Sequence, residues 1–434
     1  MKKVAFYTLG CKVNQYETEA MTALFEKDDY EQVPFDGFSD VYVINTCTVT
    51  NLGDRKSRQM IRRAKKANPQ AIIAVVGCYA QTAPEEVSAI HGVNLIIGTQ
   101  DRLRIVELIA QIHNNDEQIN VVHDILKTRE FENMQVSVYK ERTRAYIKIQ
   151  EGCTQFCSYC IIPYARGPVR SRKLEDILEE VKKLSENGFQ EIIFAGIHVA
   201  SYGQDLGDVD LLALIESVHD IASITRIRLS SIEPMTLTER FINAIAKLPK
   251  VCAHFHLSLQ SGCDHTLVRM NRKYTTEQYR TVVRNIREVL PDVSITTDIM
   301  VGFPGETATD FELSYQFVNE IQFMHTHVFQ YSPRKGTPAA SYEQQVRPQD
   351  KEIRSKKMLA LSEKNEQLFY HKFLQRELDI IIEQPHKEKE NYFEGLTSNY
   401  MRVAVLANSE MIGQSVRVCI EAIGSNILYG SVVS

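Results

Sequence analysis

The segment Cys153-Thr154-Gln155-Phe156-Cys157-Ser158-Tyr159-Cys160 spaces three cysteines as C-x3-C-x2-C, directly after a strand-like run. Three thiolates on one tight loop can hold three irons of a 4Fe–4S cube and leave the fourth iron open to another ligand. Zinc is the alternative, but zinc motifs usually pair two C-x2-C elements, and this loop contains no histidine. The segment therefore favours an iron–sulfur cluster with one open iron.

The chain around this loop alternates strand-like runs with helical stretches. Six strands are predicted: Ala145–Gln150, Glu191–Ala195, Arg226–Ser230, His254–Leu259, Ser294–Met300 and His327–Tyr331. Six βα repeats with right-handed crossovers predict a partial (β/α)6 barrel, whose functional edge lies at the C-terminal ends of its strands.

Residues 1–120 show the same alternation on a smaller scale. Strands are predicted at Val4–Leu9, Val41–Asn45, Ala71–Gly77 and Asn94–Ile97, each followed by a helical stretch. This pattern predicts an α/β fold with an open parallel αβα sheet. Cys11, Cys47 and Cys78 follow the first three strands. Because the carboxyl ends of parallel strands share one edge, we expect the three thiols to converge, although each one alone would suit a buried apolar position.

The end of the chain is different in character. A charged helix is predicted over residues 348–376, and short β-like runs follow at Leu378–Glu383, Met401–Leu406 and Val416–Ile420. These runs predict a small antiparallel β-barrel. The 434 residues thus divide into three predicted domains, 1–120, 139–370 and 371–434, in keeping with about 150 residues per domain.

The composition is that of a soluble globular protein, with 44% apolar and 24% charged residues. No run approaches the roughly 20 apolar residues that cross a membrane, and we expect neither a membrane segment nor a signal peptide. Nine cysteines in a reducing cytoplasm should remain free thiols or metal ligands. The net charge of −5 indicates no polyanionic partner for the chain as a whole.

The motif C-x3-C-x-aromatic-C is the signature of the radical S-adenosylmethionine (SAM) superfamily. Further segments resemble the methylthiotransferases of that superfamily: Leu9–Gln15, Asn45–Thr50, Val76–Gln81, Gly152–Arg172, Leu257–Gly262, Met270–Tyr274, Asp298–Glu306 and Tyr331–Pro338. The resemblance runs nearly end to end and includes the small C-terminal barrel, called TRAM in this family. It implies SAM as cofactor and two 4Fe–4S clusters, one on the catalytic cysteines Cys153, Cys157 and Cys160, the other on Cys11, Cys47 and Cys78.

Segments 10–15 and 46–50 resemble the branch that acts on N6-threonylcarbamoyladenosine at position 37 of tRNA. The implied reaction cleaves SAM to a radical that removes hydrogen from C2 of the adenine, and a methylthio group is then added. The implied partners are the tRNA anticodon loop, an electron donor such as flavodoxin or ferredoxin, and a sulfur source. The alternatives are N6-isopentenyladenosine or a ribosomal-protein aspartate as substrate, and, in another class, a non-catalytic RNA-binding protein with structural metal.

Contacts to SAM are expected from four further residues: Tyr159, Ser231, Glu233 and Gln260. Glu233 lies just beyond a predicted barrel strand, in position to bond ribose hydroxyls, and Gln260 ends another strand. The alternative for these two is an ordinary solvated or capping polar group.

Local basicity favours RNA. Residues 55–66 contain seven Lys or Arg and no acid, and Arg55, Arg58 and Arg62 share one helical face. Such a stripe can neutralise phosphates, although a solvated helix face is the alternative. Five arginines surround the cluster loop and are expected to meet the RNA backbone: Arg142, Arg144, Arg166, Arg170 and Arg172.

Overall fold

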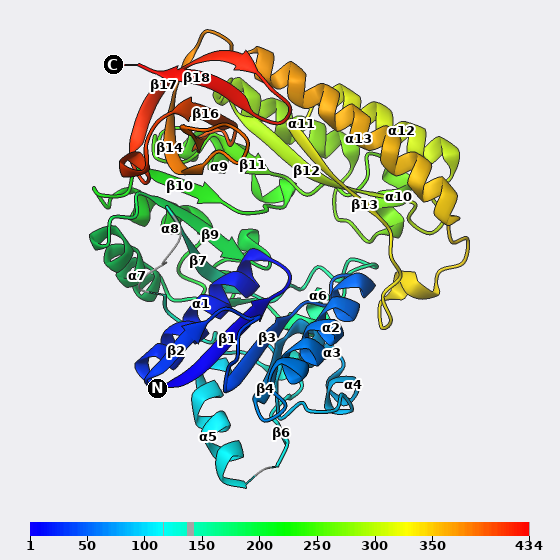
Figure 1. The fold of residues 1–434 in the computed structure, drawn as a ribbon. Helices are drawn as coiled ribbons and strands as arrows, with labels where there is room; N and C mark the ends of the chain where they lie inside the picture. Colours follow the sequence, from blue (N-terminus) through cyan, green and yellow to red (C-terminus); the bar gives the residue numbers. More distant parts are fainter. Residues whose placement is uncertain (116, 137–142, 434) are drawn as a thin grey trace.

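The computed structural model describes residues 1–115, 117–136 and 143–433. The expected domain boundary at 139 and the expected RNA contact Arg142 lie outside these ranges. Figure 1 shows a parallel sheet at the N-terminus in blue, a curved array of strands and helices from green to yellow, and a small barrel in red at the C-terminus. The expected α/β architecture is confirmed.

The N-terminal sheet has six parallel strands in the order β2-β1-β3-β4-β5-β6. The strands are β1 (Lys2–Thr8), β2 (Tyr30–Val33), β3 (Val41–Thr46), β4 (Ile72–Gly77), β5 (Leu95–Ile97) and β6 (Ile119–Asn120). The helices are α1 (Lys12–Lys27), α2 (Asn51–Ala67), α3 (Cys78–Thr82), α4 (Pro84–Ser88) and α5 (Ile105–Asn115). The sequence did not indicate β2 and β6, because both are short strands at the edges of the sheet.

The pleat of this sheet decides where the helices lie. Val41 and Val43 point to the face covered by α1 and α5, and Tyr42 and Ile44 point to the face covered by α2, α3 and α4. Both β3 and β4 are buried along their whole length, as expected for a parallel sheet covered on both faces.

The central part carries the six predicted parallel strands. They are β7 (Arg144–Glu151), β9 (Glu191–Gly196), β10 (Arg226–Leu229), β11 (His254–His256), β12 (Ser294–Val301) and β13 (His325–Gln330), with β8 (Arg170–Ser171) antiparallel to β7. Its helices are α6 (Ile162–Arg166), α7 (Leu174–Glu186), α8 (Leu211–His219), α9 (Glu239–Ile245), α10 (Asp264–Arg269), α11 (Thr276–Val289) and α12 (Ala308–Ile321). Isolated parallel bridges, such as Ile232 with Leu257, join the β7–β10 side to the β11–β13 side. The partial barrel is confirmed.

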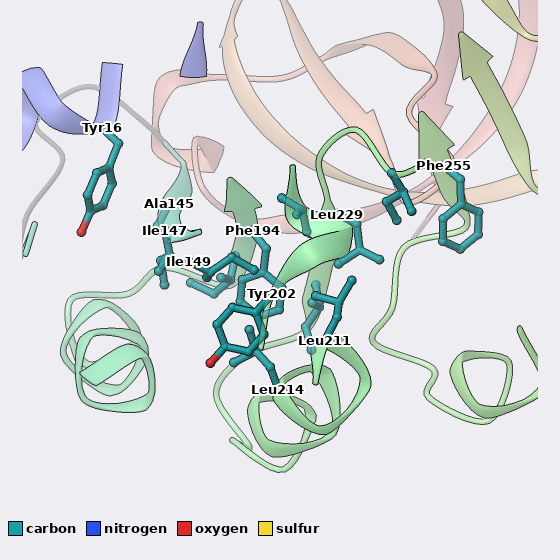
Figure 2. Close-up of a cluster of buried hydrophobic side chains, with 14 of the residues drawn as sticks. Tyr16, Ala145, Ile147, Ile149, Phe194, Tyr202, Leu211, Leu214, Leu229 and Phe255 are labelled. Carbon is teal, nitrogen blue, oxygen red and sulfur yellow. The ribbon is translucent and has the colours of Figure 1, made fainter. Parts of the chain in front are cut away.

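The first two parts share one hydrophobic core. Figure 2 shows Tyr16, which belongs to α1, in the same cluster as Ile147 of β7 and Phe194 of β9. The Tyr16 hydroxyl donates to the carbonyl of Met134 at 2.5 Å and contacts Glu180 of α7. Close packing of this kind fixes the strand ends of the N-terminal sheet relative to those of the barrel.

The C-terminal part begins with the helix α13 (Pro348–His371) and ends in a closed barrel of five strands. These are β14 (Glu377–Pro385), β15 (Tyr392–Thr397), β16 (Arg402–Leu406), β17 (Ser415–Ile423) and β18 (Leu428–Val432), in the order β14-β15-β16-β18-β17. The expected antiparallel pairing holds except between β16 and β18, which are parallel. Strand direction cannot alternate around a ring with an odd number of strands, so one parallel pair is required.

Candidate active site

The three widely separated cysteines of the N-terminal part lie at one edge of the sheet, as predicted. Cys11 follows β1, and Cys47 and Cys78 directly follow β3 and β4. Gly10 shows how close they are, because a Cβ added to it would lie 2.9 Å from Cys47 Cβ. Gly10 has a φ of +100°, a backbone conformation that favours glycine. The thiols of Cys11 and Cys47 both act electrostatically on Cys78.

A residue from the barrel completes this thiol set. Arg166, at the end of α6, donates from Nε to Cys78 Sγ at 3.2 Å and from Nη2 to Asn14 Oδ1 at 2.5 Å. The Cys11 thiol in turn donates to Asn14 Oδ1 at 3.8 Å. Burial raises the pKa of Cys78 to about 12, and the Arg166 cation opposes that rise. Asn14 lies within a segment that resembles the methylthiotransferases, but nothing in the sequence predicted its contacts with Arg166 and Cys11.

Arg166 belongs to a buried charge cluster between the two cysteine sets. Its members are almost fully shielded from solvent and pair with one another: Glu17, Glu132, Glu151, Arg102, Lys148 and Arg166. Burial alone would raise the pKa of Glu17, but Arg102, Arg166 and Lys148 outweigh it and hold the pKa well below its usual value. Charges buried at this depth are tolerated only when paired, so the cluster holds its geometry firmly.

The loop Cys153–Cys160, called the cluster loop here, directly follows β7. Gly152 precedes it with a φ of +76°, and an added Cβ would lie 1.8 Å from the Pro168 carbonyl oxygen. The backbone N–H of Cys153 donates to the Gly167 carbonyl at 3.0 Å, and that of Cys160 to the Cys157 carbonyl at 2.9 Å. These bonds hold the three cysteines on one tight turn, as the spacing predicted.

A second arginine contacts this loop in the way that Arg166 contacts the set of Cys11, Cys47 and Cys78. Arg272 donates to Cys157 Sγ at 3.3 Å. Burial raises the pKa of Cys153 to about 11 and that of Cys160 to about 12. Arg272 lies in one of the segments that resemble the methylthiotransferases, but the sequence alone predicted no contact for it.

The donor chemistry fits iron–sulfur clusters better than single metal ions. Each set offers three thiols beside an arginine, buried for Arg166 and half-buried for Arg272, and thiolates on separate irons are the ligands of a 4Fe–4S cube. Within the described ranges, no three His, Cys, Asp or Glu side chains are grouped so that they could share one metal ion. A structural zinc site requires such a group.

Of the residues expected to contact SAM, Tyr159 belongs to the loop Cys153–Cys160 and Glu233 contacts that loop. The Glu233 carboxylate accepts from Gln155 Nε2 at 3.0 Å and contacts His198 Nε2 at 3.1 Å. Gln260 has a φ of +71° and bridges to β12 through its backbone. Tyr159 is half-buried, with its ring 6.4 Å from that of Phe303.

Ser231 lines a cavity of about 880 Å³ that all three parts of the chain build. Lys12 contributes from the N-terminal part, inward residues such as Tyr146 and His256 from the barrel, and Tyr400 from the C-terminal part. The small barrel sits at the N-terminal ends of the strands, where Arg226, the first residue of β10, donates to the Leu396 carbonyl at 2.7 Å. The cavity therefore extends from the floor of the barrel to the residue beside Cys11.

The predicted RNA contacts divide into two groups. Arg55 and Arg62 on α2 are exposed, and Arg58 is half-buried and donates to the Tyr79 hydroxyl at 3.0 Å. Three other arginines, expected at the RNA backbone, are fully buried, and the prediction for them is wrong: Arg166, Arg170 and Arg172.

Their partners explain this correction. Arg166 binds Glu17 and Arg172 binds Glu180, while Arg170 donates to the Pro168 carbonyl at 3.0 Å. Arg144 likewise pairs with Glu383 of β14 at 2.6 Å. The position of an arginine in the sequence does not show whether it will form an ion pair with a carboxylate distant in the sequence.

Comparison with known proteins agrees with this geometry. The family model of the Radical SAM superfamily matches residues 147–318, and that of the uncharacterized protein family UPF0004 matches residues 3–98. The radical SAM methyltransferase TsrM from Kitasatospora setae, with cobalamin and a 4Fe–4S cluster bound, has a TM-score of 0.59 over 78% of this chain and 77% of its own, at 14% identity. The class defined by fold and site is that of radical SAM proteins.

Two relatives narrow the class. Threonylcarbamoyladenosine tRNA methylthiotransferase MtaB of Bacillus subtilis is 44% identical over 421 residues, covering 96% of this chain and 93% of that protein. The tRNA-2-methylthio-N(6)-dimethylallyladenosine synthase of Acetivibrio thermocellus is 36% identical and covers 98% of this chain and 90% of its own length. The chain belongs to the methylthiotransferase family of radical SAM enzymes. Every helix in the described ranges is too short or too polar to cross a lipid bilayer.

Proposed function

We propose that this protein methylthiolates C2 of N6-threonylcarbamoyladenosine at position 37 of tRNA. The observation that carries the proposal is the convergence of Cys11, Cys47 and Cys78 beside a radical SAM loop, in a chain more similar to the threonylcarbamoyladenosine enzyme than to the dimethylallyladenosine enzyme. A protein aspartate as substrate finds no such support. The C-x3-C-x2-C spacing of a loop without histidine also gives little support to a non-catalytic protein with structural zinc.

The cofactors we propose are SAM and two 4Fe–4S clusters. Cys153, Cys157 and Cys160 would hold one cluster and Cys11, Cys47 and Cys78 the other. With SAM, such clusters supply radical chemistry and a site for sulfur, while the protein supplies position and electrostatics. Arg272 and Arg166 would donate to cluster thiolates. Tyr159, Ser231, Glu233 and Gln260 would orient SAM at the open iron of the first cluster.

The cavity would receive the substrate base. Adenine C2 lies inside a stacked loop, so the nucleotide must leave the stack to reach the cavity, as in other enzymes that act on a base. Tyr146 of β7 and Ser231 beyond β10 line the wall that the base would meet. The exposed cations Arg55 and Arg62 on α2, with Arg58 beside them, would bind backbone phosphates of the anticodon loop.

The reaction also needs electrons and sulfur. We propose an electron donor of the flavodoxin or ferredoxin type, a separate sulfur source, and a cytoplasmic location. None of the nine cysteines forms a disulfide, and a reducing compartment would keep them available as thiols or cluster ligands.

Mass spectrometry of tRNA nucleosides from a deletion strain tests the proposal. We expect 2-methylthio-N6-threonylcarbamoyladenosine to disappear, and to return with the wild-type chain but not with Cys157→Ala. Persistence of that nucleoside in a deletion strain without a redundant enzyme would show that the substrate is another base or a protein.

A further inference from the structure

Four Lys or Arg side chains line the large cavity, and three of them are already paired. Each of the three arginines has a carboxylate partner: Arg144 with Glu383 at 2.6 Å, Arg228 with Glu191 at 2.7 Å and Arg402 with Glu394 at 3.6 Å. Lys12 differs from them. Its Nζ donates to Gln15 Oε1 at 3.4 Å and lies 5.0 Å from the centre of the Tyr146 ring, and within the described residues it has no carboxylate partner.

The position of Lys12 in its helix does not explain why a lysine occurs there. Lys12 is the first residue of α1, whose first turn contains no acidic side chain. A cation at this end of a helix opposes the helix dipole and is mildly destabilising. The side chain is exposed and buries little surface of its own. Neither helix stability nor packing therefore accounts for a lysine here.

The surroundings of Lys12 suggest a ligand with a negative charge. Lys12 is adjacent to Cys11 and contacts Tyr146, and the same cavity is also lined by Ile193 and Ser230. The buried hydroxyl oxygen of Ser230 has no hydrogen-bond partner in the part of the chain that the structure describes, so the cavity also offers an unused polar group. A carboxylate would satisfy the charge of Lys12.

We propose that Lys12 is the specificity-determining residue that pairs with the carboxylate of the threonylcarbamoyl group. This inference rests on the proposed function and extends it. The threonylcarbamoyl group ends in a carboxylate and a hydroxyl, whereas an isopentenyl group is an uncharged hydrocarbon. An exposed ammonium at the edge of the cavity would form an ion pair with the former and gain no such partner from the latter.

The test compares two anticodon stem-loop RNAs with the holoenzyme. One carries N6-threonylcarbamoyladenosine, and the other carries an analogue whose carboxylate is replaced by a hydroxymethyl group. We expect Lys12→Gln to raise KM and Kd for the first RNA about tenfold, the factor that corresponds to about 1.4 kcal/mol. Its kcat and its constants for the analogue should stay at the wild-type level, and Lys12→Arg should retain tight binding of the first RNA.

Fluorescence anisotropy without SAM gives Kd independently of turnover, and iron analysis shows whether the variant keeps its clusters beside Cys11. Lys27→Gln, an exposed lysine at the other end of α1, is the matched control and should bind both RNAs as the wild type does. Equal losses on both RNAs, or no loss on either, would overturn the role of Lys12. Wild-type enzyme that modifies an isopentenyladenosine hairpin but not the threonylcarbamoyl hairpin would instead overturn the proposed function, and Lys12 with it.

Discussion

Arg166 Nε donates a hydrogen bond to Cys78 Sγ across 3.2 Å, although the two residues stand 88 positions apart in the sequence. Cys78 begins α3 beside the N-terminal sheet, and Arg166 ends α6 in the barrel. The same guanidinium binds Asn14 and Glu17. A cation from the barrel thus completes the thiol set of the N-terminal part.

We expect Arg166→Ala to lower the free energy of unfolding by about 3–5 kcal/mol, because removing one partner leaves buried carboxylates without their cation. Glu17 and Glu151 are the carboxylates affected. Urea unfolding followed by circular dichroism measures the loss. Arg63→Ala is the control, since its pair with Asp36 is exposed and should contribute less than about 1 kcal/mol. Similar small losses in both variants would contradict the buried cluster.

Cys47→Ala should remove one of the two proposed clusters. Iron and acid-labile sulfide are expected to fall from about eight to about four per chain, since each cube holds four of each. Cys419→Ala, in β17, should keep the full content. Unchanged iron in Cys47→Ala would show that this cysteine is not a ligand.

The basic face of α2 predicts a salt effect. Removing Arg55 and Arg62 together should weaken binding of tRNA regardless of its sequence. The slope of log K against log salt should also become shallower by about 0.7–0.9 for each phosphate that is no longer neutralised. Anisotropy titrations at several salt concentrations provide the slopes. Lys356→Ala, an exposed residue of α13, should leave the slope as it is, and a wild-type slope in the arginine double variant would place the RNA elsewhere.

Gly152 and Gly188 form a matched pair. Both have a positive φ, but an added Cβ at Gly152 meets the Pro168 carbonyl at 1.8 Å, whereas at Gly188 it meets no atom of the described residues within 4 Å. Gly188→Ala should therefore cost only the backbone strain, of order 1 kcal/mol. Gly152→Ala should distort the cluster loop and lower its iron content as well. Thermal unfolding and iron analysis distinguish the two, and identical behaviour would argue against the tight loop.

Stability should fall on mild acidification because of His254. Burial, with Arg228 nearby, holds the pKa of His254 well below its usual value. The unfolded chain binds a proton below about pH 6.5 while the folded chain does not, so the stabilisation present above that pH is lost as the pH falls, by up to about 1.4 kcal/mol per pH unit. Unfolding measured from pH 8 to 5 should show a shallower slope in His254→Phe. The exposed His371→Phe should keep the wild-type slope.

The sequence predicted the features that depend on local pattern. The spacing of its three cysteines alone predicts the loop from Cys153 to Cys160. Cys11, Cys47 and Cys78 converge because parallel strands end at one edge of the sheet. Pairing between distant residues was not predictable. Arg172 and Tyr16 meet at 3.3 Å across 156 positions, and no composition or period in the sequence records such a contact. The parallel pairing of β16 with β18 follows from the odd number of strands in the small barrel. The sequence did not predict it, because two strands of that barrel, β15 and β18, were not recognised.

The small barrel also builds part of the large cavity. Its residues Glu394, Tyr400 and Arg402 form part of the cavity wall, and its carbonyls hold Arg226 and Arg228 at the base of the larger barrel. The lining of the cavity is therefore shared between the two barrels. A substitution in β15 or β16 can change the shape of the cavity without altering any residue of the larger barrel.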